Sequence, residues 1–360
     1  MKASTNAIAA AFCLLASSQP AAALPSHGLA GPQLKHWPKA AAQALNTMIA
    51  RNANKGRYAV FDMDNTSYQY DLEESLIPYL ENKGVLTRDT MDQTLKLIPF
   101  KDTASQTESL YSYYSRLCDI DDELCYPWAA QVFSGFPLSE LKGYVDELLA
   151  LNETIPTTYY DGDVLTSTDV SPPKIFAGQV ELYNRLMNNG IDVYVVSAAS
   201  EELVRMVASD PKYGYNVKPE NVIGVTVVMK NATGGLTTSR KQITEGVYNQ
   251  TANLDLVMTP YLWSPATWKA GKWAAILTYI DPWKKPVLVG GDTPASDGPM
   301  LFHGVDVARG GIHLWVNRKD AYFTDIKNTI KEYAIDQKKE NVPVTANKNW
   351  VVVKPVDILP

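Results

Sequence analysis

One stretch of the sequence reads Tyr58-Ala59-Val60-Phe61-Asp62-Met63-Asp64-Asn65-Thr66-Ser67, an apolar run that stops abruptly at two aspartates. In a strand that ends near Phe61, Asp62 lies at the tip and Asp64 on the loop just beyond, two positions apart on one face. Carboxylates this close repel each other unless a cation or a shared proton separates them. Open parallel sheets bind ligands at this end of their strands, so the pair indicates a site. The alternative is a turn that contains Asp and Asn because both favour turns.

Further along the chain, segments with the character of strands alternate with segments that have helical spacing. We expect strands at 192–196, 221–229, 286–289 and 312–316, and helices at 176–187, 201–207, 273–280 and 325–335. Such alternation predicts an α/β fold with a doubly wound parallel sheet covered by helices.

Between the first strand and this alternating region lies a long segment with little strand character. Leucines recur at helical spacing within 71–80 and 138–151, which predicts a mainly helical cap over the tip of the first strand. Residues 155–173 are expected to be loop, and 231–253 hairpin or loop. The expected division is a catalytic core at 24–67 and 171–335, a helical cap at 68–170 and a less regular tail at 336–360.

Three of the expected strands stop at small or acidic polar residues. These residues are Asp62 and Asp64, then Ser197, then Asp292 and Asp297. A doubly wound sheet gathers its strand ends along one edge, and an all-oxygen group of carboxylates there suits a hard cation such as Mg²⁺. Ser197 and the free N–H groups after it, at the start of a helix, suit a phosphate.

A lysine is needed to balance the negative charge of such a site. Lys269 and Lys272 are both candidates, at the mouth of a helix in Trp268-Lys269-Ala-Gly271-Lys272-Trp273. The whole set predicts phosphoryl transfer in which an aspartate is the nucleophile.

With these features in order, the chain resembles phosphatases of the haloacid dehalogenase (HAD) superfamily. The four motifs of that superfamily match Asp62-Met-Asp64-Asn-Thr66, Ser197, Lys272 and Gly291-Asp292 with Asp297. Each motif is weak alone, but four in order on the expected elements, over 58–316, are specific. Within the superfamily the chain is most similar to bacterial phosphorylcholine phosphatases. The similarity rests on the residues of three motif segments, Asp62–Thr66, Val196-Ser-Ala-Ala199 and Gly291-Asp-Thr-Pro294.

The resemblance implies a covalent mechanism run by two aspartates. Asp62 would attack phosphorus and become an aspartyl phosphate. Asp64 would protonate the leaving alcohol and then deprotonate the water that hydrolyses the intermediate. Dehalogenases of the superfamily lack an acid at the position of Asp64 and P-type ATPases place Lys there, so its presence favours phosphate-ester hydrolysis. Phosphomutases share it and stay open as an alternative.

The remaining roles also come from the resemblance. Asp62, the backbone carbonyl of Asp64 and Asp292 would hold Mg²⁺, and Asp297 would order a water on the metal or the lysine. The phosphate group would contact Thr66, Ser197, Ala198 and Lys272. Lys272 is preferred to Lys269, because Gly271 permits close backbone approach and Ala-Ala-Ile follows at the spacing usual in the superfamily.

The substrate is expected to be a small phosphate ester such as phosphocholine. Aromatic faces with a nearby carboxylate hold a quaternary ammonium, and the candidate aromatics are Trp263, Trp268, Tyr113 and Tyr114. The alternative is that these rings pack the cap and its hinge. Glu73 and Glu74 are possible substrate-facing acids, although a solvated helix face is the expectation.

The N-terminal residues predict export. Residues 1–23 have a weakly basic start, a short apolar run and an Ala-rich cleavage site, as in a signal peptide, with an Ala-rich tail as the alternative. After cleavage two cysteines remain, Cys118 and Cys125, which in an oxidising compartment could form a disulfide or stay free. Sequons at Asn152, Asn231 and Asn249 hint at glycosylation. The final compartment, whether extracellular, vacuolar or periplasmic, stays open.

Composition narrows the function classes. A net charge of −6 without a dense Lys/Arg run argues against nucleic acid as a partner, and no further apolar run could span a membrane. The four histidines have no zinc-ligand spacing, which argues against zinc hydrolases and histidine phosphatases. Three hypotheses remain: an exported Mg²⁺-dependent phosphatase acting on phosphocholine, a broad-specificity acid phosphatase of the same superfamily, and a secreted binding protein without turnover.

Overall fold

The computed structural model describes residues 28–360, with β1 (Arg57–Phe61) inside an eight-stranded sheet. The order of the sheet is β12-β11-β10-β1-β6-β7-β8, and β9 also pairs with β7. The other strands are β6 (Ile191–Ser200), β7 (Val222–Lys230), β8 (Leu236–Thr237), β9 (Val257–Trp263), β10 (Leu288–Gly291), β11 (Ile312–Val316) and β12 (Trp350–Val353). From β12 to β7 every pairing is parallel, while β8 and β9 run antiparallel to β7.

The alternation of side chains along β1 divides the core into two layers. Ala59 and Phe61 belong to the layer that contains α1 (Lys39–Asn52) and α6 (Ala177–Asn188). Tyr58 and Val60 point the other way, into a layer formed with the helices named next. These are α10 (Ala270–Ala275), α11 (Pro294–Gly304) and α12 (Asp320–Lys339). Both faces of the sheet are thus covered by helices, and the predicted doubly wound α/β fold is confirmed.

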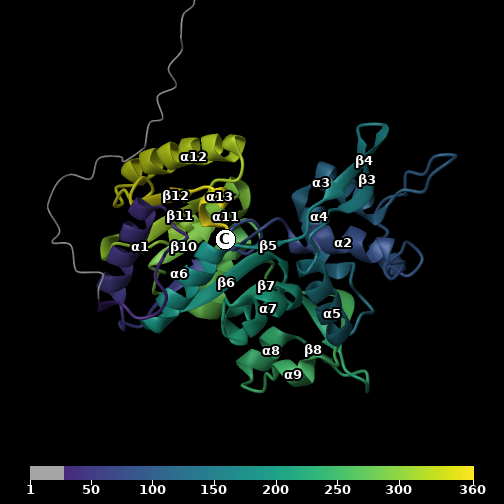
Figure 1. Cartoon of the computed structure of the whole chain (residues 1–360), viewed down its shortest axis with the longest axis horizontal. Coiled ribbons are helices and arrows are strands. Elements are labelled where there is room, and N and C mark those ends of the chain that lie inside the picture. Colours follow the sequence, from purple (N-terminus) through teal and green to yellow (C-terminus); the bar gives the residue numbers. More distant parts are fainter. Residues whose placement is uncertain (1–27) are drawn as a thin grey trace, which may run out of the picture.

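The segment after β1 forms a separate body beside the sheet (Figure 1). Its helices are α2 (Leu72–Asn82), α3 (Leu110–Ile120), α4 (Asp122–Gln131) and α5 (Leu138–Leu149). At its two ends, β2 (Tyr68–Gln69) pairs antiparallel with β5 (Lys174–Ile175). Because the chain leaves and re-enters the core side by side, this helical segment is placed over the end of β1.

One element of this cap was predicted wrongly. Residues 155–173, expected to be loop, contain the antiparallel hairpin of β3 (Ile155–Asp161) and β4 (Val164–Val170). Thr and Tyr residues with high strand propensity fill β3, and Gly162 at φ +61° makes the turn. The two strands stabilise each other only as a pair, so neither was recognised alone.

The second half of the chain holds further strands that were not predicted. Residues 257–263 form β9, which pairs with β7, and the tail expected to be irregular supplies β12 at the edge of the sheet and α13 (Pro355–Ile358). The segment 231–253, expected to be hairpin or loop, contains β8 with α8 (Ser239–Thr244) and α9 (Gln250–Asn253). β9 and β12 depend on partner strands, β7 and β11, that are separated from them in the sequence by other elements.

Cys118 and Cys125 form a disulfide that joins the end of α3 to α4, which decides between the two alternatives for this pair. The signal-peptide prediction for 1–23 falls outside the described residues. Within 28–360, no helix combines the length and the apolar character that crossing a membrane requires.

Candidate active site

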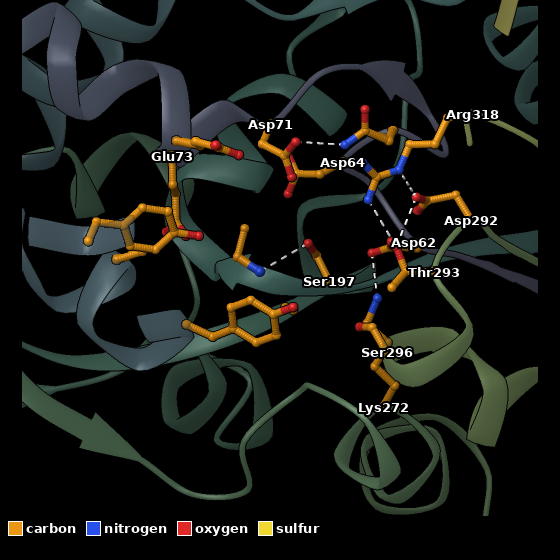
Figure 2. A pocket seen from close by; sticks show the side chains of 17 residues that line it. Asp62, Asp64, Asp71, Glu73, Ser197, Lys272, Asp292, Thr293, Ser296 and Arg318 are labelled. Atoms are coloured by element: carbon orange, nitrogen blue, oxygen red, sulfur yellow. Dashed lines mark hydrogen bonds and ion pairs between the residues drawn. The ribbon is translucent and has the colours of Figure 1, made fainter. Parts of the chain in front are cut away.

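A polar pocket opens where β1, β6 and β10 end, beneath α2, α3 and α4 of the cap (Figure 2). The strands bring their carboxyl ends to one edge because β1 pairs in parallel with both β6 and β10. Residues that line the pocket and carry polar groups are Asp62, Asp64, Asn65, Asp71, Glu73, Glu74, Tyr114, Tyr126, Ser197, Lys272, Asp292, Thr293, Ser296 and Arg318. Six carboxylates therefore face two cationic side chains, an excess of negative charge that favours cationic ligands.

Asp62 and Lys272 form the centre of this pocket. The Lys272 ammonium lies 2.6 Å from Asp62 Oδ1 and 2.7 Å from Asp297 Oδ1, and its side chain is completely buried. Burial alone would lower the pKa of Lys272, but Asp297 and Asp62 outweigh it and raise that pKa. Burial raises the pKa of Asp62 well above its usual range, with Asp297 adding to the effect and Lys272 opposing it.

Lys269, the alternative to Lys272, lies elsewhere. Its side chain is 35% exposed and lies 3.6 Å from Glu123 on α4 of the cap. Gly271, in the first turn of α10, packs closely against the preceding loop, since a Cβ at this position would lie 2.0 Å from the carbonyl oxygen of Ala266. Only a glycine permits this contact, and Lys272 follows it directly and contacts Asp62.

Asp297 accepts three donors from the protein. Oδ1 contacts Lys272, and Oδ2 accepts the backbone N–H groups of Asp292, at 2.8 Å, and Thr293, at 2.9 Å. These contacts suit Asp297 to hold the lysine and the loop after β10 in place.

Asp292 and Asp62 are the carboxylates best placed for a cation. One oxygen from each of Asp62, Asp292 and Asp297 lies within 4.8 Å of the others, and all three side chains are buried. Burial raises the pKa of Asp292 to about 6, although Arg318 opposes the shift. Buried carboxylates this close fit a divalent metal, because a cation would relieve their repulsion and oxygen ligands suit it.

Asp64 is held by the start of the cap. Its Oδ1 accepts the hydroxyl of Tyr68 at 2.7 Å and the backbone N–H of Leu72 at 2.8 Å. Burial, followed by the nearby charge of Asp71, raises the pKa of Asp64 to about 7. A carboxyl with a pKa near neutrality is suited to donate and accept protons.

The residues predicted to bind phosphate divide into two groups. Ser197, Ala198 and Ala199 line the pocket at the end of β6, where Ser197 Oγ accepts the N–H of Ala199 at 3.2 Å. Thr66 does not line the pocket: its hydroxyl is buried and donates to Asp292 Oδ1 at 3.0 Å. The structure therefore places Thr66 against an aspartate that could hold a metal.

The wall opposite Asp62 is formed by the cap and is both acidic and aromatic. Glu73 is buried and accepts the N–H of Ser200 at 2.7 Å, so the expectation of a solvated helix face was wrong for this residue. Glu74 accepts the hydroxyl of Tyr111 at 3.1 Å, and burial, then Asp71, raises the pKa of Glu74 to about 7. Both acids lie in the first turn of α2, immediately after the aspartate motif.

Three of the four predicted substrate aromatics lie away from this wall. Tyr113 is buried in the cap, with its ring 4.5 Å from Phe100 and its hydroxyl bonded to the backbone of Ile98. Trp263 is 42% exposed on β9, and neither it nor Trp268 is among the described residues that line the pocket. Neighbouring residues on a helix point in different directions, so Tyr114 lines the pocket together with Tyr126 while Tyr113 does not.

Sequence reasoning missed Arg318 and Asp71. Arg318 lies beyond β11, and its guanidinium contacts Asp292 and Thr293 (Figure 2). Asp71 immediately precedes α2 and accepts the amide of Asn65 at 2.7 Å. Asp71 stands at the expected start of a helix and close to the motif, a signal that could have indicated it; Arg318 has no comparable signal.

Comparison with known proteins gives a close relative in sequence and neighbours in fold. No protein-family model matches the sequence. The chain is 68% identical over 327 residues to a protein named phosphorylcholine phosphatase from Pseudomonas aeruginosa, covering 91% of this chain and 93% of that protein. A crystal structure of a conserved functionally unknown protein from Anaerococcus prevotii DSM 20548 has a TM-score of 0.56 and 19% identity, over 84% of this chain and 92% of that one. This second similarity supports the fold alone.

Proposed function

The chain belongs to the phosphorylcholine phosphatase family and is a phosphoric monoester hydrolase. We propose that it hydrolyses phosphocholine, or a similar small phosphate ester, that the reaction requires Mg²⁺, and that it passes through a phosphorylated Asp62. The observation that carries the proposal is the contact of Lys272 with Asp62 at 2.6 Å, next to Asp292 at the ends of β1 and β10. The predicted signal peptide supports export of the mature enzyme.

Asp62 is the nucleophile in this proposal. Lys272 holds one of its oxygens, so the other can attack phosphorus along a fixed direction. Lys272 also remains close enough to balance charge on the phosphoryl group as the ester bond breaks. Ser197 and the backbone at Ala198 line the same pocket and are placed to orient the phosphoryl oxygens.

Asp64 is the proton donor and acceptor. With a pKa of about 7, both its protonated and its ionised form are populated at neutral pH: the first gives a proton to the leaving oxygen, and the second takes one from the water that hydrolyses the aspartyl phosphate. A divalent cation held by Asp62, the backbone carbonyl of Asp64 and Asp292 would stabilise the negative charge on the phosphoryl oxygens.

Removal of divalent metal is expected to abolish hydrolysis, and Mg²⁺ is expected to restore it. The reason is the repulsion among Asp62, Asp292 and the phosphate dianion, which Lys272 and Arg318 do not fully balance. The measurement is phosphate release from a panel of esters after treatment with a chelator, with and without added Mg²⁺. Full activity in the chelated enzyme would contradict the metal dependence. Similar rates on every ester would favour the broad-specificity acid phosphatase.

The acidic and aromatic wall supports a substrate with a quaternary ammonium. Tyr114 and Tyr126 contribute aromatic rings, and Glu74 and Asp71 contribute carboxylates, to the lining of the pocket. A choline group is attracted to such ring faces and carboxylates, by about 0.5–2 kcal/mol for each ring contact. Phosphocholine would then place its phosphate toward Asp62 and its ammonium toward the cap.

Replacement of Glu74 by Gln is expected to raise the KM for phosphocholine by roughly tenfold and to leave the KM for phenyl phosphate unchanged. Only phosphocholine has a positively charged group that the Glu74 carboxylate can pair with. In the wild type the pKa of Glu74 is about 7, so it is ionised above that pH and becomes neutral below it. The ratio of kcat/KM for phosphocholine to that for phenyl phosphate should therefore fall as pH drops through 7, and this pH dependence should vanish in Glu74→Gln.

Two variants serve as controls for this prediction. Glu147→Gln removes an acid of the cap that is 52% exposed and pairs with Lys83, so it should leave both KM values unchanged. Trp263→Ala, in a residue outside the pocket lining, should affect the two substrates equally. Equal changes in both KM values for Glu74→Gln would contradict the placement of the ammonium.

The remaining hypothesis, a secreted binding protein without turnover, has no support from the site. Asp62, Asp64, Lys272 and Asp292 are all present and lie in one pocket. A protein that only bound its ligand would not need a buried lysine between two aspartates.

A further inference from the structure

Arg318 belongs to the short segment between β11 and α12, and it reaches back across the sheet edge to the pocket (Figure 2). Its Nε donates to Asp292 Oδ2, and a terminal guanidinium nitrogen donates to Thr293 Oγ1 at 3.1 Å. The guanidinium also lies 5.1 Å from the ring centroid of Tyr322, the third residue of α12. These contacts give the side chain one defined position.

Asp292 is consequently satisfied by the protein on both of its oxygens. Oδ1 accepts the Thr66 hydroxyl at 3.0 Å, and Oδ2 accepts Arg318 together with the Thr293 hydroxyl at 3.0 Å. The Asp292 side chain is 2% exposed and that of Arg318 is 21% exposed. A cation that takes Oδ2 of Asp292 has to displace one of these two donors, and the guanidinium both competes for this oxygen and repels the incoming cation.

Arg318 has other acids nearby in the pocket. It lines the cavity with Asp71 and Glu74, and its charge acts on both of these acids. A guanidinium released from Asp292 would therefore still be attracted to carboxylates of the same pocket.

From this geometry we propose that Arg318 occupies Asp292 as a built-in cation, that it competes with the divalent metal for Oδ2, and that it thereby weakens metal binding. The inference rests on the proposed metal-dependent function. Without metal, Arg318 keeps Asp292 paired and limits its repulsion with Asp62 and Asp297. Arg318 acts through Asp292 and is a positioning residue.

The test is calorimetric titration of Mg²⁺ alone into four proteins: wild type, Arg318→Gln, Arg318→Lys and the matched control Arg309→Gln. Arg309 forms a surface pair with Asp306 and is 53% exposed. Removing the competitor is expected to tighten Mg²⁺ binding roughly tenfold in Arg318→Gln. Arg318→Lys keeps the charge without the planar fork and should fall between Arg318→Gln and wild type. Arg309→Gln should match wild type.

A second readout separates competition from a purely structural role. Arg318→Gln should lower the Tm of the metal-free protein, and saturating Mg²⁺ should reduce this difference, because the bound ion replaces the lost positive charge. A residue that only held the fold would lower the Tm equally with and without Mg²⁺.

The outcomes distinguish this inference from the proposed function. Unchanged or weaker Mg²⁺ affinity in Arg318→Gln, with normal binding by wild type, would overturn the role of Arg318 and leave the metal dependence intact. No Mg²⁺ binding by wild type or by any variant would overturn both.

Discussion

Replacement of Asp62 by Asn is expected to lower kcat for phosphocholine by roughly 10⁴-fold or more, the scale seen when a catalytic nucleophile is removed. An amide cannot attack phosphorus to form the acyl phosphate that the proposed mechanism needs. The side chain keeps its size, so the variant should still fold and should still place Lys272 against Asp297 at 2.7 Å. Steady-state phosphate release gives the rate, and a thermal melt of the same sample reports folding.

A second measurement addresses the covalent intermediate directly. Rapid acid quench of the wild type during turnover, followed by mass spectrometry, should show one phosphoryl group on the peptide that contains Asp62, and the Asp62→Asn protein should show none. Retained turnover in the folded variant, or a phosphoryl group on another residue, would reject Asp62 as the nucleophile.

Replacement of Lys272 by Met should lower both the free energy of unfolding and kcat. The variant leaves Asp62 and Asp297 buried together without their shared cation, and breaking a buried ion pair in this way costs about 3–5 kcal/mol. Loss of charge balance at the phosphoryl group should also lower kcat by about 10²–10³-fold. Denaturant unfolding at pH 7 measures the first effect and phosphate release the second.

Lys269→Met is the matched control for this prediction. The two lysines are three positions apart, but Lys269 is 35% exposed and faces Glu123 on the cap. Its loss should change the free energy of unfolding by less than about 1 kcal/mol, as expected for an exposed pair. If Lys269→Met were the inactive and unstable variant, the assignment of the site lysine would be reversed.

The central part of the fold follows from local patterns. Apolar runs that end in Asp62, Ser197 and Asp292 alternate with helical segments, and parallel strands necessarily bring such ends to one edge. The strands missed were the two-residue β2 and β5, the hairpin of β3 and β4, β9 and the edge strand β12. β9 and β12 become strands through pairing with β7 and β11, partners that no local window of sequence contains, whereas β3 and β4 stabilise each other across a tight turn.

The site shows the same division. The residues at strand ends and Lys272, in its helix-start motif, were expected from the sequence to lie together, and they do lie together at one pocket, because their chemistry and their position on an element coincide. The burial of Glu73 and the positions of Trp263 and Tyr113 outside the pocket lining were not, since each depends on what packs against the cap, while Tyr114 was among the candidates and does line the pocket.

The local patterns of apolar and polar residues thus determined the parallel core, the acidic residues at the strand ends and the chemistry expected of these residues. Tertiary packing alone selected the ring faces and acids that face the substrate side, and it alone brought Arg318 against Asp292 from 26 positions away. The physical reason is the distance along the sequence over which each feature is determined. Hydrophobic periodicity and the polar residues at strand ends are contained within a few consecutive residues, whereas burial and ion pairing depend on which segments fold against one another.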